Sequence, residues 1–225
     1  NGDRIYPTRE LEILSVEYTE QEREIHGLLD SFTKSRLESV HDTPSDFGTS
    51  FIHKLLKKRL FSSPLAFALT LAKHRQTLAN GKNKGQKRSM QERILRKAIQ
   101  RCEEDYADDL QVEEAEQQAV ESATELSGAV TAEQADMLER LSAWAENAKN
   151  RRDSKADAIL EWLDEHLKTD GMPNRKRVIL FTEYRATHSW LTEILASSGW
   201  GGERLMTLHG KTDPDDRERI KAAFQ

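Results

Sequence analysis

The chain has 225 residues, of which 36% are hydrophobic and 32% charged, and a formal net charge of −5. Because globular domains carry roughly a quarter of charged residues, we expect long exposed helices rather than one deep core. The charge gives no global case for nucleic-acid binding, so any such surface must be local. The single cysteine, Cys102, excludes an intrachain disulfide and a cysteine-rich zinc site. No apolar run approaches the ~20 residues of a membrane span, so we expect a cytoplasmic, membrane-free protein.

The first 30 residues are predicted to form a link and the start of a helix. Residues 9–18 alternate between apolar and acidic side chains, which is typical of an extended segment or an edge strand. Thr19 and Glu22 have the spacing of a capping box, so a helix should follow them.

Residues 31–150 are predicted to be a helical region, with a probable insertion at 80–150. Pro64 follows two serines and suits the first turn of a helix. Ser89–Glu92 and Thr131–Gln134 each have the spacing of a capping box. We also expect a loop at 41–48, a helix at 49–60 and a loop at 80–89. From Val112 to Val130 the apolar periodicity fades.

Residues 151–225 have a different pattern from the rest of the chain. After a helix that begins at Ser154, short apolar runs alternate with amphipathic stretches, which predicts a parallel β-α-β-α series. Its elements are strand 177–182, helix 184–198, strand 204–208 and helix 214–225. Since sheets usually have ~4–6 strands, we expect the remaining strands to follow Gln225 and the chain to be a piece of a longer protein.

Small polar residues follow both predicted strands. Thr182 ends the first strand, and Gly210 and Lys211 follow the second, just before a helix. Ligands of open parallel sheets bind at this edge, and exposed amides at helix starts suit a phosphate. The three residues are therefore candidates for contacting a nucleic-acid backbone; the alternative is that they are ordinary loop residues. Arg217 either supports this loop, contacts a phosphate, or pairs with Asp213.

A basic block precedes an acidic one between residues 82 and 116. Lys84, Lys87 and Arg88 are the candidates in it for contacting DNA phosphates, with an affinity that salt would weaken. The alternative is a solvated helix whose basic and acidic ends pair with neighbouring helices.

Several stretches resemble the SWI/SNF-related DNA translocases of helicase superfamily two. VILFTEY (178–184), followed by LHGKT (208–212) with spaced Arg, Ile and Phe, looks like the start of the second RecA-like domain of these enzymes. DSKADAILEWL (153–163) resembles the helix before that domain. Residues 9–29 resemble the link after the first RecA-like domain, and residues 57–74 resemble the helical region of bacterial members.

The resemblance implies a mostly helical α/β chain whose residues 151–225 begin a truncated RecA-like unit. The parent protein would be a DNA-dependent ATPase that uses ATP and Mg²⁺, with duplex DNA and its own first RecA-like lobe as partners. The chain has no P-loop, because in GKNKGQKRS (81–89) the glycines are one residue too close and Gln86 replaces the lysine. We therefore expect no catalytic residue, cofactor, metal or ATP hydrolysis in this chain.

Two other functions stay open at this point. The first is a non-enzymatic helical scaffold in which residues 1–170 bind a protein partner. The second is a different α/β enzyme, such as a nucleotide-binding transferase, whose glycine-rich phosphate loop lies in sequence outside this chain.

Overall fold

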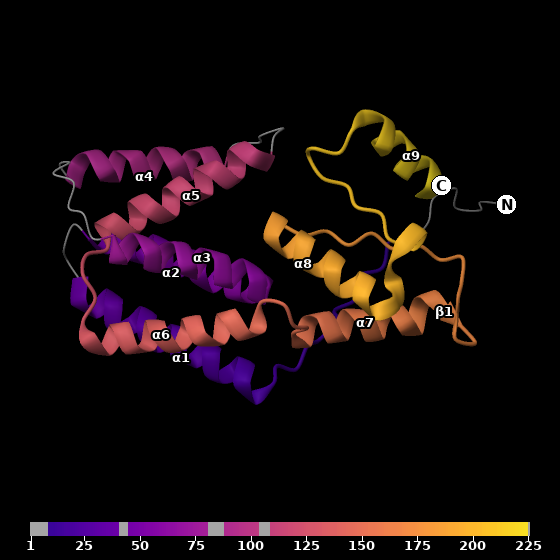
Figure 1. Cartoon of the computed structure of the whole chain (residues 1–225), viewed down its shortest axis with the longest axis horizontal. Coiled ribbons are helices and arrows are strands. Elements are labelled where there is room, and N and C mark those ends of the chain that lie inside the picture. The colour runs from indigo at the N-terminus through magenta and orange to yellow at the C-terminus, as the bar shows by residue number, and fades with distance from the viewer. Residues whose placement is uncertain (1–8, 41–44, 81–87, 104–108, 225) are drawn as a thin grey trace.

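The computed structural model describes residues 9–40, 45–80, 88–103 and 109–224, without the side chains of 88–89, 101–103 and 109–113. Figure 1 shows a helical bundle beside a smaller unit of helices and connecting segments. The α-helices of the described part are α1 Glu20–Val40, α2 Asp46–Ser62, α3 Pro64–Ala79, α4 Arg88–Glu103, α5 Asp109–Leu126, α6 Ala132–Ala148, α7 Ser154–Leu167, α8 Arg185–Leu195 and α9 Pro214–Phe224.

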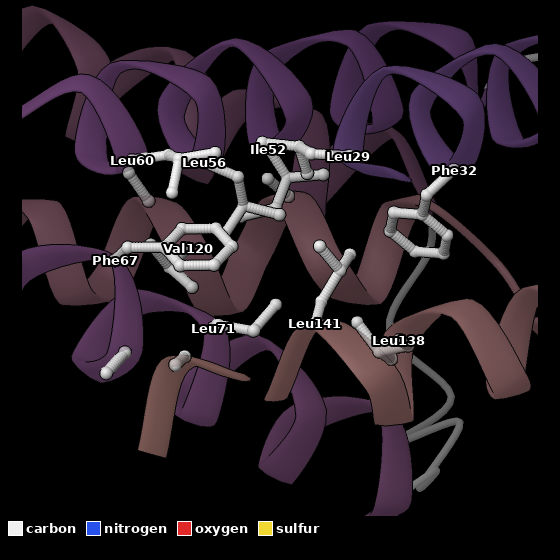
Figure 2. Packing of buried hydrophobic residues seen from close by; sticks show 14 of the residues in the cluster. Leu29, Phe32, Ile52, Leu56, Leu60, Phe67, Leu71, Val120, Leu138 and Leu141 are labelled. Atoms are coloured by element: carbon white, nitrogen blue, oxygen red, sulfur yellow. The ribbon is translucent and has the colours of Figure 1, made fainter. Parts of the chain in front are cut away.

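Helices α1 to α6 share one hydrophobic core. Figure 2 shows side chains of α1, α2, α3, α5 and α6 meeting in it, and Leu95 and Ala98 add α4 to the same cluster. The expected insertion at 80–150 is therefore packed into the core of the preceding helices, because α4, α5 and α6 fall in that range. Fully buried members of the core include Leu29, Phe32, Ile52, Leu56, Phe67, Leu71 and Leu141.

Helix α5 occupies most of the stretch in which the apolar periodicity fades. Its buried face carries Ala119 and Ala123, side chains too small to give a strong hydrophobic pattern. They allow α2 to come close: a Cβ added at Gly48 would lie 2.6 Å from Leu126 Cβ and 2.8 Å from the carbonyl oxygen of Ala123. The predicted loop 41–48 is therefore wrong at its end, because α2 begins at Asp46 and uses Gly48 for helix contact.

The guanidinium of Arg36 joins α1 to the carboxyl end of α5. Arg36 is 1% exposed. Its Nη1 donates to the carbonyl of Ala129 (2.6 Å) and to Gln134 Oε1 (3.2 Å), and its Nη2 donates to the carbonyls of Ser127 (2.6 Å) and Gly128 (3.1 Å). The three carbonyls lie just past the carboxyl end of α5, where the helix dipole is negative, which favours a cation. Burial lowers the pKa of Arg36 from its ordinary value.

Two of the three predicted capping boxes are confirmed. The Thr131 side chain accepts from the amide of Gln134, whose own side chain accepts from the amide of Thr131. Thr19 and Glu22 do the same at α1. Glu22 also accepts from the amide of Ser154 (2.9 Å) and from its hydroxyl, so it also binds the start of α7. The third predicted box is wrong in position, since α4 begins at Arg88 and Ser89 therefore lies inside the helix.

Helices α7 and α8 form a second, smaller hydrophobic cluster. Leu160 and Leu163 of α7 pack with Trp190 and Ile194 of α8. After α7 the chain makes a tight hairpin, in which β1 Lys168–Thr169 pairs antiparallel with β2 Met172–Pro173. Asp170 and Gly171, at its turn, have φ values of 53° and 75°, which an Asp-Gly pair tolerates well.

The expected RecA-like parallel βα unit is not shown. In the described part of the chain the sheet is the two-stranded β1–β2 hairpin, and residues 177–182 and 204–208 are assigned to no strand. Helices α8 and α9 follow them as expected, with α8 ending at Leu195 in a π-helical turn, Ala196–Trp200. A strand exists only by pairing with a neighbour, and these two segments do not pair with each other. Residues 9–18 also form no strand, so the edge-strand alternative is wrong.

Replacing Arg36 should destabilise the whole bundle. We expect Arg36→Met to lower the free energy of unfolding by roughly 3 kcal/mol, because it leaves buried carbonyls without donors. Urea unfolding followed by circular dichroism measures this loss. The control is Arg75→Met, which removes a half-exposed pair with Glu139 and should cost less than about 1 kcal/mol. Equal losses for the two variants would contradict the assigned role.

Two buried histidines should make the bundle acid-sensitive. Burial, with Arg36 nearby, lowers the pKa values of His53 and His74 to about 3, against an ordinary value of 6.5. Between pH 6.5 and pH 3, these histidines are therefore protonated in the unfolded chain and neutral in the folded chain. Stability should be complete above pH 6.5 and fall toward pH 3, by about 2 kcal/mol per histidine at pH 5.

Urea unfolding at pH 7.5 and pH 5 tests this dependence. A His53→Gln/His74→Gln double variant should lose much less stability between the two values than the original chain. The same loss in both proteins would show that other groups cause the acid sensitivity.

Candidate functional site

A groove of about 950 Å³ lies between the helical bundle and the C-terminal unit. One wall comes from α3 and α5, and the other from residues 180–186 and 208–210. Its lining mixes charged, polar and apolar side chains, among them Lys73, Glu116, Leu69, Leu180, Phe181 and Leu208. Such a lining suits a ligand that has both polar groups and apolar surface.

Two predicted site residues meet at this groove. Thr182 and Gly210 both line it, although 27 residues separate them and no sheet joins their segments. Lys211, next to Gly210, is exposed and is not among the lining residues. Lys84 and Lys87 lie outside the described residues; Arg88 is the first residue of α4, and its side chain is also outside the description.

Arg217 supports the loop at residues 209–212. Its Nη2 donates to the carbonyls of Gly210 (2.7 Å) and His209 (3.2 Å), and its Nε donates to the carbonyl of Thr212 (3.0 Å). Asp213 instead caps α9 by accepting from the amide of Asp215 (2.9 Å). These contacts correspond to the first of the three expected roles of Arg217, support of the loop.

Two amides of the same loop are used internally. The His209 amide donates to Thr212 Oγ1 (2.9 Å), and the Lys211 amide donates to His209 Nδ1 (3.2 Å). A phosphate at this loop would therefore meet side chains and the remaining amides rather than a full ring of free N–H groups. The His188 ring lies edge-on to the His209 ring, with centroids 5.9 Å apart, and connects the loop to α8.

Arg59 is the residue of this region that the sequence analysis missed. It is buried on the inner face of α2, where Nη2 pairs with Glu116 of α5 at 2.6 Å. Its guanidinium lies over the ring of Tyr184, 3.5 Å from the centroid. A signal was present, because Arg59 falls at i+7 and i+3 from Ile52 and Leu56 on the apolar stripe of α2.

Tyr184 connects this arginine to the segment that carries Thr182. The pKa of Tyr184 is raised to about 12, first by burial and then by a hydrogen bond with Glu183, while Arg59 acts in the opposite direction. The phenol is therefore neutral at physiological pH and packs as a ring against the cation. Through this contact the helical bundle fixes the position of the wall at residues 180–184.

Hydroxyl groups make a second link between the two units. Thr187 of α8 lies within hydrogen-bonding distance of Ser62 (2.6 Å) and Ser63 (2.9 Å) at the junction of α2 and α3. Lys155 of α7 donates to the carbonyl of Ser62 (2.8 Å) and to that of Phe61. These contacts hold α7 and α8 against the junction of α2 and α3. Ser62, Lys155 and Thr187 line a second hollow of about 270 Å³ rather than the groove itself.

The charged block on α4 is described only in part. Arg96 pairs with Glu92 (2.7 Å) and lies over the Phe47 ring, 4.4 Å from its centroid. Gln91 donates to Glu125 of α5 (3.0 Å). These contacts match the alternative in which the block pairs within the bundle, and the proposed DNA contacts of its other cations stay a prediction.

No protein family, no curated protein and no solved structure matches this chain. Within the described residues, no three histidine, cysteine or acidic side chains gather in a way that could hold a metal ion. The helices of that same part are too short or too polar for any of them to cross a bilayer.

The Arg59–Tyr184 contact should carry measurable energy. We expect a double-mutant cycle with Arg59→Met and Tyr184→Leu to give a coupling of about 1–2 kcal/mol, as for a desolvated cation–π pair. Urea unfolding of the four proteins provides the values. A matched cycle on Lys58 and Glu183, exposed and 4.0 Å apart, should give less than about 0.5 kcal/mol. Two equal couplings would remove Arg59 as the link between the units.

Proposed function

We propose that this chain is part of an ATP-dependent DNA translocase, to which it contributes nucleic-acid backbone contacts and coupling between the two RecA-like lobes. The observation that supports this most is the state of residues 178–183. They are apolar for the most part, lead directly into α8, and leave Ile179 56% and Phe181 90% exposed. A segment of this kind resembles a sheet strand whose neighbours are elsewhere.

The order of elements supports the same proposal. Residues 177–182 precede α8 and residues 204–208 precede α9, which is the alternation of a parallel βα unit. The second segment also exposes apolar side chains, Met206 and Leu208. Neighbouring strands supplied by the parent protein would cover both segments and turn their carboxyl ends into one edge.

At that edge, Thr182, Gly210 and Lys211 would contact the phosphate backbone of duplex DNA. Arg217 would act through the loop that it holds, as a positioning residue. ATP and Mg²⁺ would bind between the lobes of the parent protein, through residues outside this chain. The bundle would follow the motion of the second lobe through Arg59 and Tyr184.

A helical scaffold is the second candidate function. It is favoured by the bundle itself, since α1 to α6 have a complete core independent of the C-terminal unit. In that case the groove beside α3 would receive a protein partner and the parent protein would have no ATPase activity.

ATP hydrolysis by the full-length parent protein, with and without duplex DNA, tests the proposal. We expect hydrolysis that duplex DNA stimulates, and none from the 225-residue chain alone. A Thr182→Val/Lys211→Ala variant of the parent should keep its basal rate and lose about tenfold of its apparent DNA affinity. Arg140→Ala, on the exposed side of α6, is the matched control. A parent protein without ATPase activity under either condition would leave the scaffold as the better proposal.

A further inference from the structure

A pair of adjacent arginines, Arg151 and Arg152, precedes a serine at the start of α7. Both arginines are exposed and lie in the non-helical connection between α6 and α7. The serine, Ser154, is the first residue of α7 and is half-buried. Positive charges two and three residues before a hydroxyl are the pattern that the acidic substrate clefts of one class of serine kinases recognise, through charge complementarity.

The structure distinguishes this serine from the others at the same spacing. Three serines of the chain have an arginine three residues before them, and they are Ser39, Ser62 and Ser154. The arginines before the first two are Arg36 and Arg59, which are both buried and held by the contacts described above. A kinase can therefore reach the arginines before Ser154 on the folded chain, but not those before the other two serines.

The hydroxyl of Ser154 takes part in the contact between α1 and α7. It donates to Glu22 Oε2, and the amide of Ser154 donates to Glu22 Oε1 at 2.9 Å. The amide of Thr19 donates to Ser154 Oγ at 3.4 Å. The cap of α1 and the first residue of α7 are therefore joined through one serine side chain, and the carboxylate of Glu22 depends on the hydrogen of its hydroxyl.

A phosphate on Ser154 would turn this attraction into repulsion. In the transfer, Ser154 Oγ attacks the γ-phosphorus of an ATP held by the kinase, and the bond between that phosphorus and the bridging oxygen breaks. ADP leaves, and the hydroxyl proton passes to the catalytic aspartate of the kinase. The modified serine has no hydrogen to donate to Glu22 and carries a charge of about −1.5 to −2 beside its carboxylate.

The segment before the serine needs little rearrangement to enter a kinase cleft. Asp153 already has extended backbone angles, φ −102° and ψ 171°, and helix ends open at low cost. The pair between Arg152 and Asp157 (3.2 Å) has both side chains about half exposed, so it is weak. The indole of Trp190 donates to the carbonyl of Arg151 at 3.3 Å, and this hydrogen bond has to open as well.

We propose that Ser154 is a phosphorylation site for an arginine-directed serine kinase, and that its phosphate separates the start of α1 from α7. Glu22 and Ser154 belong to neither hydrophobic cluster, so both clusters stay packed when the two residues part. The elements released are the extended segment 9–18 and the first turn of α1. The site does not depend on the translocase function, because neither DNA nor a second lobe takes part in it.

Peptide mass spectrometry tests the site, after the 225-residue chain is incubated with ATP and a kinase of this specificity, the catalytic subunit of cyclic-AMP-dependent protein kinase. We expect one phosphate per chain, on Ser154, and none on Ser154→Ala. An Arg151→Gln/Arg152→Gln variant should be modified at least about tenfold more slowly. Arg140→Gln, on the exposed side of α6, is the matched control and should be modified at the original rate.

A synthetic peptide of residues 148–160 shows whether the kinase is active on this sequence. Modification of the peptide without modification of the folded chain would overturn the site. A phosphate mainly on another residue would do the same, and Thr207, which follows the exposed Arg204 by three residues, is the natural competitor.

Urea unfolding followed by circular dichroism tests the effect of the phosphate. Modification of the original chain should lower the urea midpoint by about 0.5 M, since a charge-assisted hydrogen bond is replaced by repulsion. In a Glu22→Gln variant the shift should be less than half as large, because the amide can donate to the phosphate. An unchanged midpoint, or equal shifts in the two proteins, would contradict the separation of α1 from α7.

None of these results bears on the ATPase test of the parent protein. Conversely, a parent without ATPase activity would leave the phosphorylation site unaffected.

Discussion

A guanidinium buried among carbonyl oxygens determines how the bundle is assembled. All four acceptors of Arg36 are neutral oxygens, three of them carbonyls just past the carboxyl end of α5. A buried charge is tolerated only where its donors are satisfied, and here satisfaction requires α1, the end of α5 and the start of α6 to meet at one point. With these three points fixed, the apolar side chains of the core have one arrangement of the helices in which to pack. The position of the groove also depends on this packing, since α3 and α5 form one of its walls.

Arg59 is a second buried guanidinium, and its charge is satisfied by different partners. It has a carboxylate, Glu116, and an aromatic face, Tyr184, where Arg36 has carbonyls. Among the lysine, arginine and acidic residues that the structure describes, Arg36 and Arg59 are the buried ones, and each has its own set of partners. They also connect the interior to the surface, because Tyr184 belongs to the segment that carries Thr182. The packing of the bundle therefore also determines the shape of the groove, through the contact of Arg59 with Tyr184.

Local signals predicted local features, and contacts distant in sequence were beyond them. The capping boxes at Thr19 and Thr131 and the break at Pro64 involve residues three or four apart, and the structure has them. Helix α5 was missed because alanines carry its buried face, and the Asp170-Gly171 turn was overlooked although its dipeptide is typical of a hairpin. The acceptors of Arg36 lie more than 90 residues away, so no pattern around it could reveal them. Thr182 and Gly210 could be placed at loop ends, but the bundle wall opposite them could not.

Glu22 makes the beginning of the chain depend on a part that is synthesised much later. Its carboxylate completes the cap of α1 and also holds Ser154, 132 residues further on. A ribosome releases α1 long before α7 exists, so α1 must first form with only its own half of the cap. The contact between Glu22 and Ser154 joins the start of α1 to the start of α7 across 132 residues of chain. Contacts this far apart in sequence form late, because closing a long stretch of chain costs entropy. A nascent chain that stops before Ser154 would carry α1 with this carboxylate still facing water.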